Sequence, residues 1–340
     1  MSDPTLVVAE SAQASASARR QRLIRQLMRL LGPAVLVVVL LRVPDREHIL
    51  EVFQRASLWP LAGVALLNFV VAWLKVVRWQ VMLETRGIRY GTLRGLGAFM
   101  SSVYLANLTP GRLGDLLRVQ YLRHDVGAPT SEGLASILLD RLCDLWVLAA
   151  FVAVGAFRYG AVIVGKLAWV TWAAVALIAV SPLVLRAPGY AEKAFAGIYR
   201  KLSGDVAGEG LTRFLAATRA NLGVSLFKTI PLTVAAFGIN YLQGWLVARA
   251  VGLPLLFVDA ICLLAVASML GLLPISVSGM GVRELFFAMV FPLLGFTAAA
   301  GVAFGLVVFA ATYLANSVFG FVSWQIYPPP TGAPRQERAA

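Results

Sequence analysis

Charged residues, cysteine and histidine are scarce in this chain of 340 residues. Charged residues make up 14% of it, against roughly a quarter in soluble proteins, while 59% of its residues are hydrophobic. This composition predicts an integral membrane protein with no separate soluble catalytic domain. The two cysteines and two histidines are isolated in the sequence, so we expect no disulfide framework, no metal site and no cofactor.

Acidic residues are few as well, 17 against 30 lysines and arginines, which leaves a net charge of +13. The basic residues are scattered between apolar runs instead of being gathered with aromatic residues on one face, which argues against nucleic acid as a partner. Membrane lipids with anionic headgroups are the partners we expect. The positive-inside rule assigns most basic residues, among them Lys75 and Arg78, to the cytoplasmic side together with both chain termini.

The apolar runs predict an all-α, polytopic membrane protein with about six spanning helices. Residues 1–25 are expected to be a disordered cytoplasmic N-terminus and residues 328–340 a cytoplasmic tail. Between them we expect two membrane repeats of inverted orientation, residues 26–157 and residues 158–327. The expected spans are residues 26–43, 58–77, 134–157, 161–185, 227–251 and 297–326.

Two further apolar segments, residues 96–122 and 258–294, are interrupted by proline and glycine. Since these residues end one helix and open another, each segment predicts a re-entrant helical hairpin. The first is expected to enter from the cytoplasmic side and the second from the external side. Interrupted segments at matching places in inverted repeats point to the binding site of a transporter. The turn residues are Pro110, Gly111, Gly114, Pro274, Gly279 and Gly281.

Ionisable residues at membrane depth are candidates for function, because inserting each costs about 2.5–3.5 kcal/mol. Asp140 and Asp144 are one helical turn apart, with Arg141 in reach of Asp144. Arg283 and Glu284 directly follow the second glycine turn. The half-helix that begins after each turn exposes backbone N–H groups that suit a phosphate or carboxylate. The predicted substrate-binding residues are Arg112, Asp115, Arg118, Asp140, Arg141, Asp144, Arg283 and Glu284.

The same residues also admit purely structural interpretations. Asp140, Arg141 and Asp144 can form an ion-pair staple, and Arg283 can pair with Glu284. Arg118 can be an anchor that extends its charge to the membrane interface. Catalysis is not expected, because two carboxylates with an arginine between them make a poor Mg²⁺ site. We therefore expect that the protein is not an enzyme.

Three motifs in order carry a family resemblance. They are TPGRLGDLLR at residues 109–118, LLDRLCD at residues 138–144, and the run from Pro274 to Glu284 that ends in GMGVRE. Together they resemble the transmembrane region of the lysylphosphatidylglycerol synthase/flippase family, from the first span to about Tyr327. The resemblance implies a bacterial inner-membrane protein of the stand-alone form, without the soluble synthase domain. By this resemblance, the eight predicted substrate-binding residues match the family's polar motif positions.

We therefore expect a lipid flippase or scramblase that moves an anionic or aminoacylated phospholipid between leaflets of the bacterial inner membrane. One alternative is transport of a polyprenyl-linked or hopanoid lipid. Another is a non-transporting accessory subunit of a lipid-modifying enzyme, and a membrane-embedded transferase ranks third. A homo-oligomer or a lipid-modifying enzyme is a further possible partner.

Overall fold

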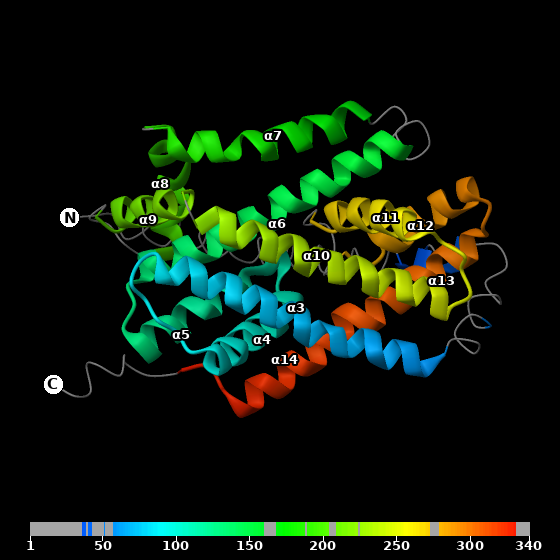
Figure 1. Cartoon of the computed structure of the whole chain (residues 1–340), viewed down its shortest axis with the longest axis horizontal. Helices are drawn as coiled ribbons and strands as arrows, with labels where there is room; N and C mark the ends of the chain where they lie inside the picture. The colour runs from blue at the N-terminus through cyan, green and yellow to red at the C-terminus, as the bar shows by residue number, and fades with distance from the viewer. Residues whose placement is uncertain are drawn as a thin grey trace, which may run out of the picture.

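The computed structural model describes residues 36–38, 40–42, 51, 57–159, 168–187, 189–203, 209–223, 225–272 and 279–330. Within these ranges the chain is helical and has no strand, in agreement with the predicted all-α class (Figure 1). The expected disordered N-terminus, most of the first expected span, Pro274 and the end of the tail lie outside the described residues.

Among the described residues, three helical stretches are long and apolar enough to cross a membrane. The first is α3 (Leu58–Glu84) and the second is α10 (Ser225–Ala250). The third is a continuous rod, Ala298–Ile326, in which a π-helical stretch, η5, joins α13 to α14. The bounds within the rod are α13 (Ala298–Val308), η5 (Phe309–Leu314) and α14 (Ala315–Ile326).

Of the remaining helices, α7 runs along the upper edge of the view in Figure 1, and α4 packs against α3 and α14. The expected spans at residues 134–157 and 161–185 correspond to α6 and to the described part of α7. The bounds are α4 (Thr92–Leu108), η1 (Pro110–Leu116), α5 (Leu117–Val126), α6 (Thr130–Tyr159), α7 (Ala168–Arg186), α8 (Tyr190–Ser203), α9 (Glu209–Asn221), α11 (Phe257–Leu270), α12 (Val282–Val290) and η4 (Phe291–Leu294).

Helices α3 and α10 lie side by side and run antiparallel (Figure 1). The Gln243 amide nitrogen lies 3.1 Å from the Asn68 amide oxygen, and an Arg78 guanidinium nitrogen lies 2.8 Å from the Thr233 hydroxyl. Helix α3 continues beyond the predicted end of this span near residue 77, as far as Glu84. The apolar run in the sequence ends at Lys75 and Arg78, but the helix continues past them. Their charges are compensated within the protein, because Lys75 pairs with Asp144 and Arg78 pairs with Asp140.

The first interrupted segment breaks as its sequence predicts. Helix α4 ends at Leu108, and Pro110 begins the 3₁₀-helix η1, which folds back against α4. The contact is so close that a Cβ at Gly114 would lie 2.1 Å from the backbone nitrogen of Ala106. The backbone at Arg112 has φ +56°, a left-handed conformation that few non-glycine residues adopt. Only glycine fits at position 114.

The second segment is also divided into two helices. Helix α11 ends at Leu270, and α12 begins at Val282. The glycines at this break adopt positive φ, +77° at Gly279 and +84° at Gly281, which favours glycine. Both breaks are therefore present at the predicted turns, whereas the entry of each segment into a membrane from one side stays a prediction.

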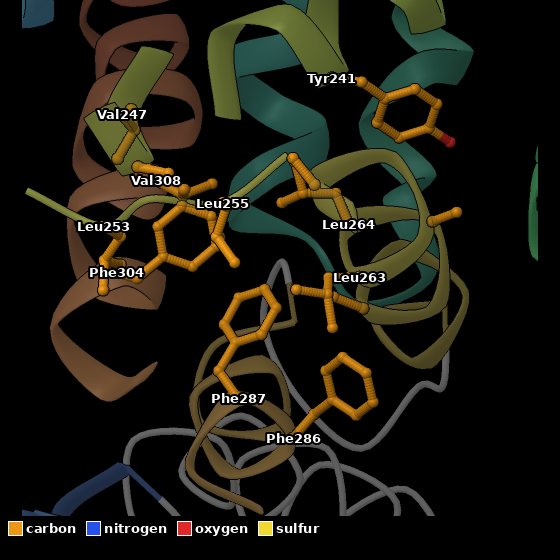
Figure 2. Packing of buried hydrophobic residues seen from close by; sticks show 14 of the residues in the cluster. Tyr241, Val247, Leu253, Leu255, Leu263, Leu264, Phe286, Phe287, Phe304 and Val308 are labelled. Carbon is orange, nitrogen blue, oxygen red and sulfur yellow. The ribbon is translucent and has the colours of Figure 1, made fainter. Parts of the chain in front are cut away.

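The largest apolar cluster joins α11, α12 and the last rod (Figure 2). The ring of Phe287 packs edge-on against Phe304 with centroids 5.1 Å apart, and against Phe291 at 5.7 Å. A Cβ at Gly301 would lie 2.5 Å from the Phe287 carbonyl oxygen, so α12 packs directly on the α13 backbone. This cluster fixes the second interrupted segment against the last rod.

Candidate functional site

A cavity of about 540 Å³ lies where the two interrupted segments meet α3, α6, α10 and the last rod. We call it the polar cavity. The first segment supplies lining residues between Thr109 and Leu116, and the second supplies Gly271, Leu272 and Gly279. Four cationic and two anionic residues line it, which gives it an excess of positive charge. They are Lys75, Arg112, Asp115, Arg141, Asp144 and Arg283.

Beneath the polar cavity lies an ion cluster formed by Arg78, Arg118 and Asp140, which we call the buried layer. All three side chains are fully buried. Arg78 donates from Nε to one oxygen of Asp140 at 3.1 Å, and Arg118 donates from Nη2 to the other at 3.0 Å. The guanidinium of Arg118 also lies 5.3 Å from each of the Trp79 and Phe99 ring centroids. Both carboxylate oxygens of Asp140 are thus occupied.

A second ion cluster, the cavity layer, consists of Lys75, Arg112, Asp115, Arg141 and Asp144. Lys75 Nζ lies 2.7 Å from Asp144 Oδ2, and Arg141 Nη2 lies 3.0 Å from Asp115 Oδ2. Arg112 Nε lies 3.7 Å from the same oxygen of Asp115. Arg78 connects the two layers by donating from Nη1 to Asp144 at 2.7 Å. The side chains of Arg112 and Arg141 are 38% and 28% exposed, so these two cations are open to the cavity.

On the opposite side of the polar cavity, Arg283 pairs with Glu284 at 2.7 Å. Glu284 also accepts the backbone N–H of Gly281 at 2.6 Å and so caps α12. The Arg283 guanidinium lies 5.3 Å from the Phe309 ring centroid and 5.1 Å from that of Tyr313. Arg283 lines the cavity, while Glu284 lies behind it and fixes both the arginine and the helix start.

Neutral polar groups hold the π-helical stretch η5 in place. Asn68 donates to the carbonyl of Ala311 at 3.0 Å, and Asn316 donates to the Asn68 amide oxygen at 3.2 Å. Such π-helical turns occur frequently at functional sites. Here η5 places Thr312 and Tyr313 on the wall of the polar cavity.

A family model described as Lysylphosphatidylglycerol synthase TM region matches residues 26–320. The chain belongs to this family. It is a membrane domain of the lysylphosphatidylglycerol synthase/flippase type, and its apolar helices agree with a membrane location. No match to the chain was found among curated proteins.

All eight predicted site residues of this family member lie in or beside the polar cavity. Six of them, from Arg112 to Asp144, form one continuous ion network, and Arg283 and Glu284 lie across the cavity from it. The interpretation of Arg118 as an interfacial anchor is wrong, because its side chain is fully buried against Asp140. The Arg118 side chain instead points into the protein.

The sequence-based reasoning missed Lys75 and Arg78. Both were assigned to the cytoplasmic side, but the structure pairs them with Asp144 and Asp140 inside the protein. Lys75 and Arg78 are three residues apart, so on a helix they lie on the same face. This spacing could have indicated that both side chains point in one direction. At the two places where an anion site was expected, Gly111 lies within the 3₁₀-helix η1, and the Glu284 carboxylate accepts the Gly281 N–H.

Proposed function

We propose that this protein moves a lipid with an anionic headgroup between the leaflets of the bacterial inner membrane, as a flippase or scramblase. The polar cavity carries this proposal, because it lies between two interrupted segments and has an excess of positive charge. Its volume of about 540 Å³ suits a headgroup more than an entire lipid. The headgroup would enter the cavity while the acyl chains stay outside.

The cations of the cavity layer are the proposed headgroup ligands. The Nε atoms of Arg112 and Arg141 are buried and have no hydrogen-bond partner within the described part of the chain. A phosphate oxygen is a suitable acceptor for such donors, and hydrogen bonds between two charged groups are the stronger kind. Asp115 and Asp144 hold these cations when no lipid is bound, and a phosphate would compete with them for the same donors.

The apolar rim of the cavity offers a place for the acyl chains. Leu113 and Leu272 both line the polar cavity, and they are 58% and 50% exposed. They belong to the first and the second interrupted segment, so the rim is apolar on both. An amphipathic ligand would place its phosphate among the arginines and its chains beyond these leucines.

The proposed membrane arrangement has about six spans, two re-entrant hairpins from opposite faces and both termini in the cytoplasm. The two inverted repeats would then bring one hairpin from each side to the polar cavity, as in transporters built from inverted repeats. We propose no chemical step, so lipid movement follows a gradient or is coupled to ions.

The test is leaflet exchange of fluorescent lipids in proteoliposomes containing anionic or aminoacylated phospholipids. Arg141→Gln should lower the exchange rate at least about tenfold, the effect of about 1.4 kcal/mol. Arg158→Gln is the matched control, because Arg158 pairs with Asp259 at an exposed site outside the cavity. Exchange no faster than in empty vesicles for every lipid, with lipid still bound to the purified protein, would favour an accessory subunit instead.

A further inference from the structure

The last rod contacts a different interrupted segment with each of its halves. Its first half, α13, packs on α12, and its second half, α14, packs on α4 (Figure 1). Within the described ranges, neither half packs to a comparable extent on the other segment. We call α4 with α14 the first-segment unit, and α12 with α13 the second-segment unit. The rod therefore connects the two segments that meet at the polar cavity.

Close backbone contacts hold each half of the rod to its own segment. A Cβ at Gly301 of α13 would lie 2.5 Å from the Phe287 carbonyl oxygen on α12. A Cβ at Gly320 of α14 would likewise lie 2.5 Å from the Met100 carbonyl oxygen on α4. Because close-packed elements transmit strain instead of deforming, we expect each unit to move as one body.

Hydrogen bonds strengthen the first-segment unit. Asn107 donates to the Ser317 hydroxyl at 3.0 Å, and Ser323 donates to the Gly97 carbonyl at 3.0 Å. Both bonds join α4 to α14, on the C-terminal side of the π-helical stretch η5. The aromatic cluster described above holds the second-segment unit, on the N-terminal side of η5. The close contacts of the rod with the two segments therefore lie on either side of η5.

The π-helical stretch η5 is the part of the rod where a bend is expected. Thr312, within it, donates its hydroxyl to the Val308 carbonyl at 2.6 Å, and Ser317, just beyond it, donates to the Tyr313 carbonyl at 2.9 Å. Such bonds from a side chain to the carbonyl four residues earlier slightly destabilise a helix and often bend it. Sharp helix kinks also occur at π-helical turns.

Asn68 of α3 holds η5 in the observed arrangement. Outside the rod, η5 packs mainly on α3. The Asn68 amide donates to the Ala311 carbonyl of η5 at 3.0 Å, and its oxygen accepts from Asn316 of α14 at 3.2 Å. A rotation at η5 would move Ala311 and Asn316 relative to each other, so Asn68 would not keep both bonds. These bonds therefore stabilise one geometry of the rod over others.

The π-helical stretch also forms part of the wall of the polar cavity. Thr312, Tyr313 and Asn316 line the cavity. Arg283 of α12 lines it as well, with its guanidinium 5.3 Å from the Phe309 ring centroid and 5.1 Å from that of Tyr313. A ligand in the cavity would therefore contact both η5 and the second-segment unit. Such a ligand favours whichever rod geometry it binds more tightly.

We propose that η5 is a hinge about which the first-segment unit and the second-segment unit turn relative to each other, so that the polar cavity opens to the two leaflets in turn. This inference rests on the proposed function, since it describes how the cavity would pass a headgroup across the membrane. The packing within each unit is kept during the motion. The bonds from Asn68 to the rod are those that break.

The experiment measures distances between pairs of spin labels by pulsed electron paramagnetic resonance. The labels are attached to exposed positions in a variant whose two buried native cysteines are replaced by alanine. Met289→Cys of α12 and Val322→Cys of α14 form the hinge pair, which spans η5. Leu93→Cys of α4 and Val318→Cys of α14 form the control pair, which lies within the first-segment unit.

Both pairs are measured in nanodiscs of phosphatidylcholine, with and without phosphatidylglycerol. The hinge pair should give two distances, whose proportions change at least about twofold when phosphatidylglycerol is present. The control pair should give one distance, the same in both nanodiscs, because α4 and α14 move together.

Asn68→Ala tests the residue that holds the hinge. It removes bonds made in one geometry, so it should change the ratio of the two hinge-pair distances about two- to tenfold. Asn107→Ala is the matched control, since it also removes a buried asparagine that bonds to the rod, but within the first-segment unit. The ratio should stay unchanged in this variant.

Three outcomes overturn the hinge. They are a single hinge-pair distance that is the same in both nanodiscs, a control-pair distance that changes with phosphatidylglycerol, and equal effects of the two asparagine variants. The proposed function stands in each case if proteoliposomes still exchange lipid. Conversely, two hinge-pair distances that respond to phosphatidylglycerol, without lipid exchange in proteoliposomes, would support the hinge and count against transport.

Discussion

Arg78 on α3 and Asp140 on α6 form an ion pair in which neither side chain has any exposed surface. The carboxylate is shared with Arg118, and Arg78 reaches on to Asp144 and Thr233. Four elements, α3, α5, α6 and α10, therefore meet at one buried charge cluster. The cluster adjoins the polar cavity through Asp144, which lines the cavity and pairs with Arg78.

Breaking the buried layer should destabilise the protein severely. Arg78→Gln leaves Asp140 with one cationic partner fewer and is expected to lower the free energy of unfolding by about 3–5 kcal/mol. The measurement is thermal unfolding in detergent. Arg86→Gln is the control, because Arg86 pairs with Glu132 at a partly exposed site and should cost about 0–1 kcal/mol. Equal stability of the two variants would refute a structural role for this layer.

The fold-back of the first interrupted segment should depend on Gly114. A Cβ there would lie 2.1 Å from the Ala106 backbone, so Gly114→Ala must separate η1 from α4. We expect a loss of at least about 1–3 kcal/mol from overpacking, together with loss of lipid exchange. Gly63→Ala is the control, since a Cβ at Gly63 of α3 meets no atom within 4 Å and should stabilise the helix by about 0.5–1 kcal/mol. A neutral Gly114→Ala would contradict the close contact.

The π-helical stretch should require Asn68. Asn68→Ala removes the donor to the Ala311 carbonyl and leaves that buried acceptor without its partner, at a cost of about 1–3 kcal/mol. Because η5 carries Thr312 and Tyr313, headgroup binding should weaken as well. Gln120→Ala, an exposed amide on α5, provides the control. Calorimetry and unfolding on the same preparations would separate the two effects, and an unchanged affinity would argue against positioning by Asn68.

The stability of the protein should depend on pH through Asp125. This residue lies on α5 and pairs with Tyr327, which directly follows the last rod. Burial raises the pKa of this carboxyl, but hydrogen bonds from Tyr327, Tyr90 and His124 outweigh burial and hold the pKa below its ordinary value. Its contribution is therefore complete above the unfolded pKa of about 3.9 and is lost as pH falls through the lower folded pKa.

The measurement is the unfolding temperature as a function of pH. At neutral pH the unfolding temperature of Asp125→Asn should lie below that of the unaltered protein. The difference should shrink as the pH is lowered below about 4. Glu209→Gln, whose carboxylate is exposed on α9, should show no such convergence. A difference that stays constant down to acidic pH would mean that the tyrosines do not stabilise the charged carboxylate.

The sequence was sufficient to predict the family, the helical class, the two helix breaks and the charged residues that line the cavity within the motifs, but not Thr109, Leu113 and Leu116 of the same motifs. Proline and glycine act on the local backbone, so the breaks at Pro110 and Gly279 follow from local chemistry. Lys75 and Arg78 were missed because the end of an apolar run resembles the end of a membrane span. Only the packing of α3 on α6 shows that their charges point inward.

The π-helical stretch was beyond prediction for another reason. An apolar run does not distinguish an α-helix from a π-helix, because both satisfy their backbone within the segment. The η5 geometry depends on Asn68, about 240 residues away in the chain. The sequence also does not show that the Tyr241 hydroxyl has no hydrogen-bond partner among the described residues.

The ion network is divided into two layers with different roles: the buried layer stabilises the fold, and the cavity layer determines which ligand is preferred. Arg78, Arg118 and Asp140 pair with one another outside the cavity lining, whereas Arg112 and Arg141 line the polar cavity, where we propose that the headgroup binds. Relatives of this chain can therefore diverge in the lipids they recognise by exchanging a handful of wall residues, with the underlying scaffold inherited intact. We expect sequence divergence to concentrate on the π-helical turn and on α10, which contribute uncharged polar residues to the cavity wall.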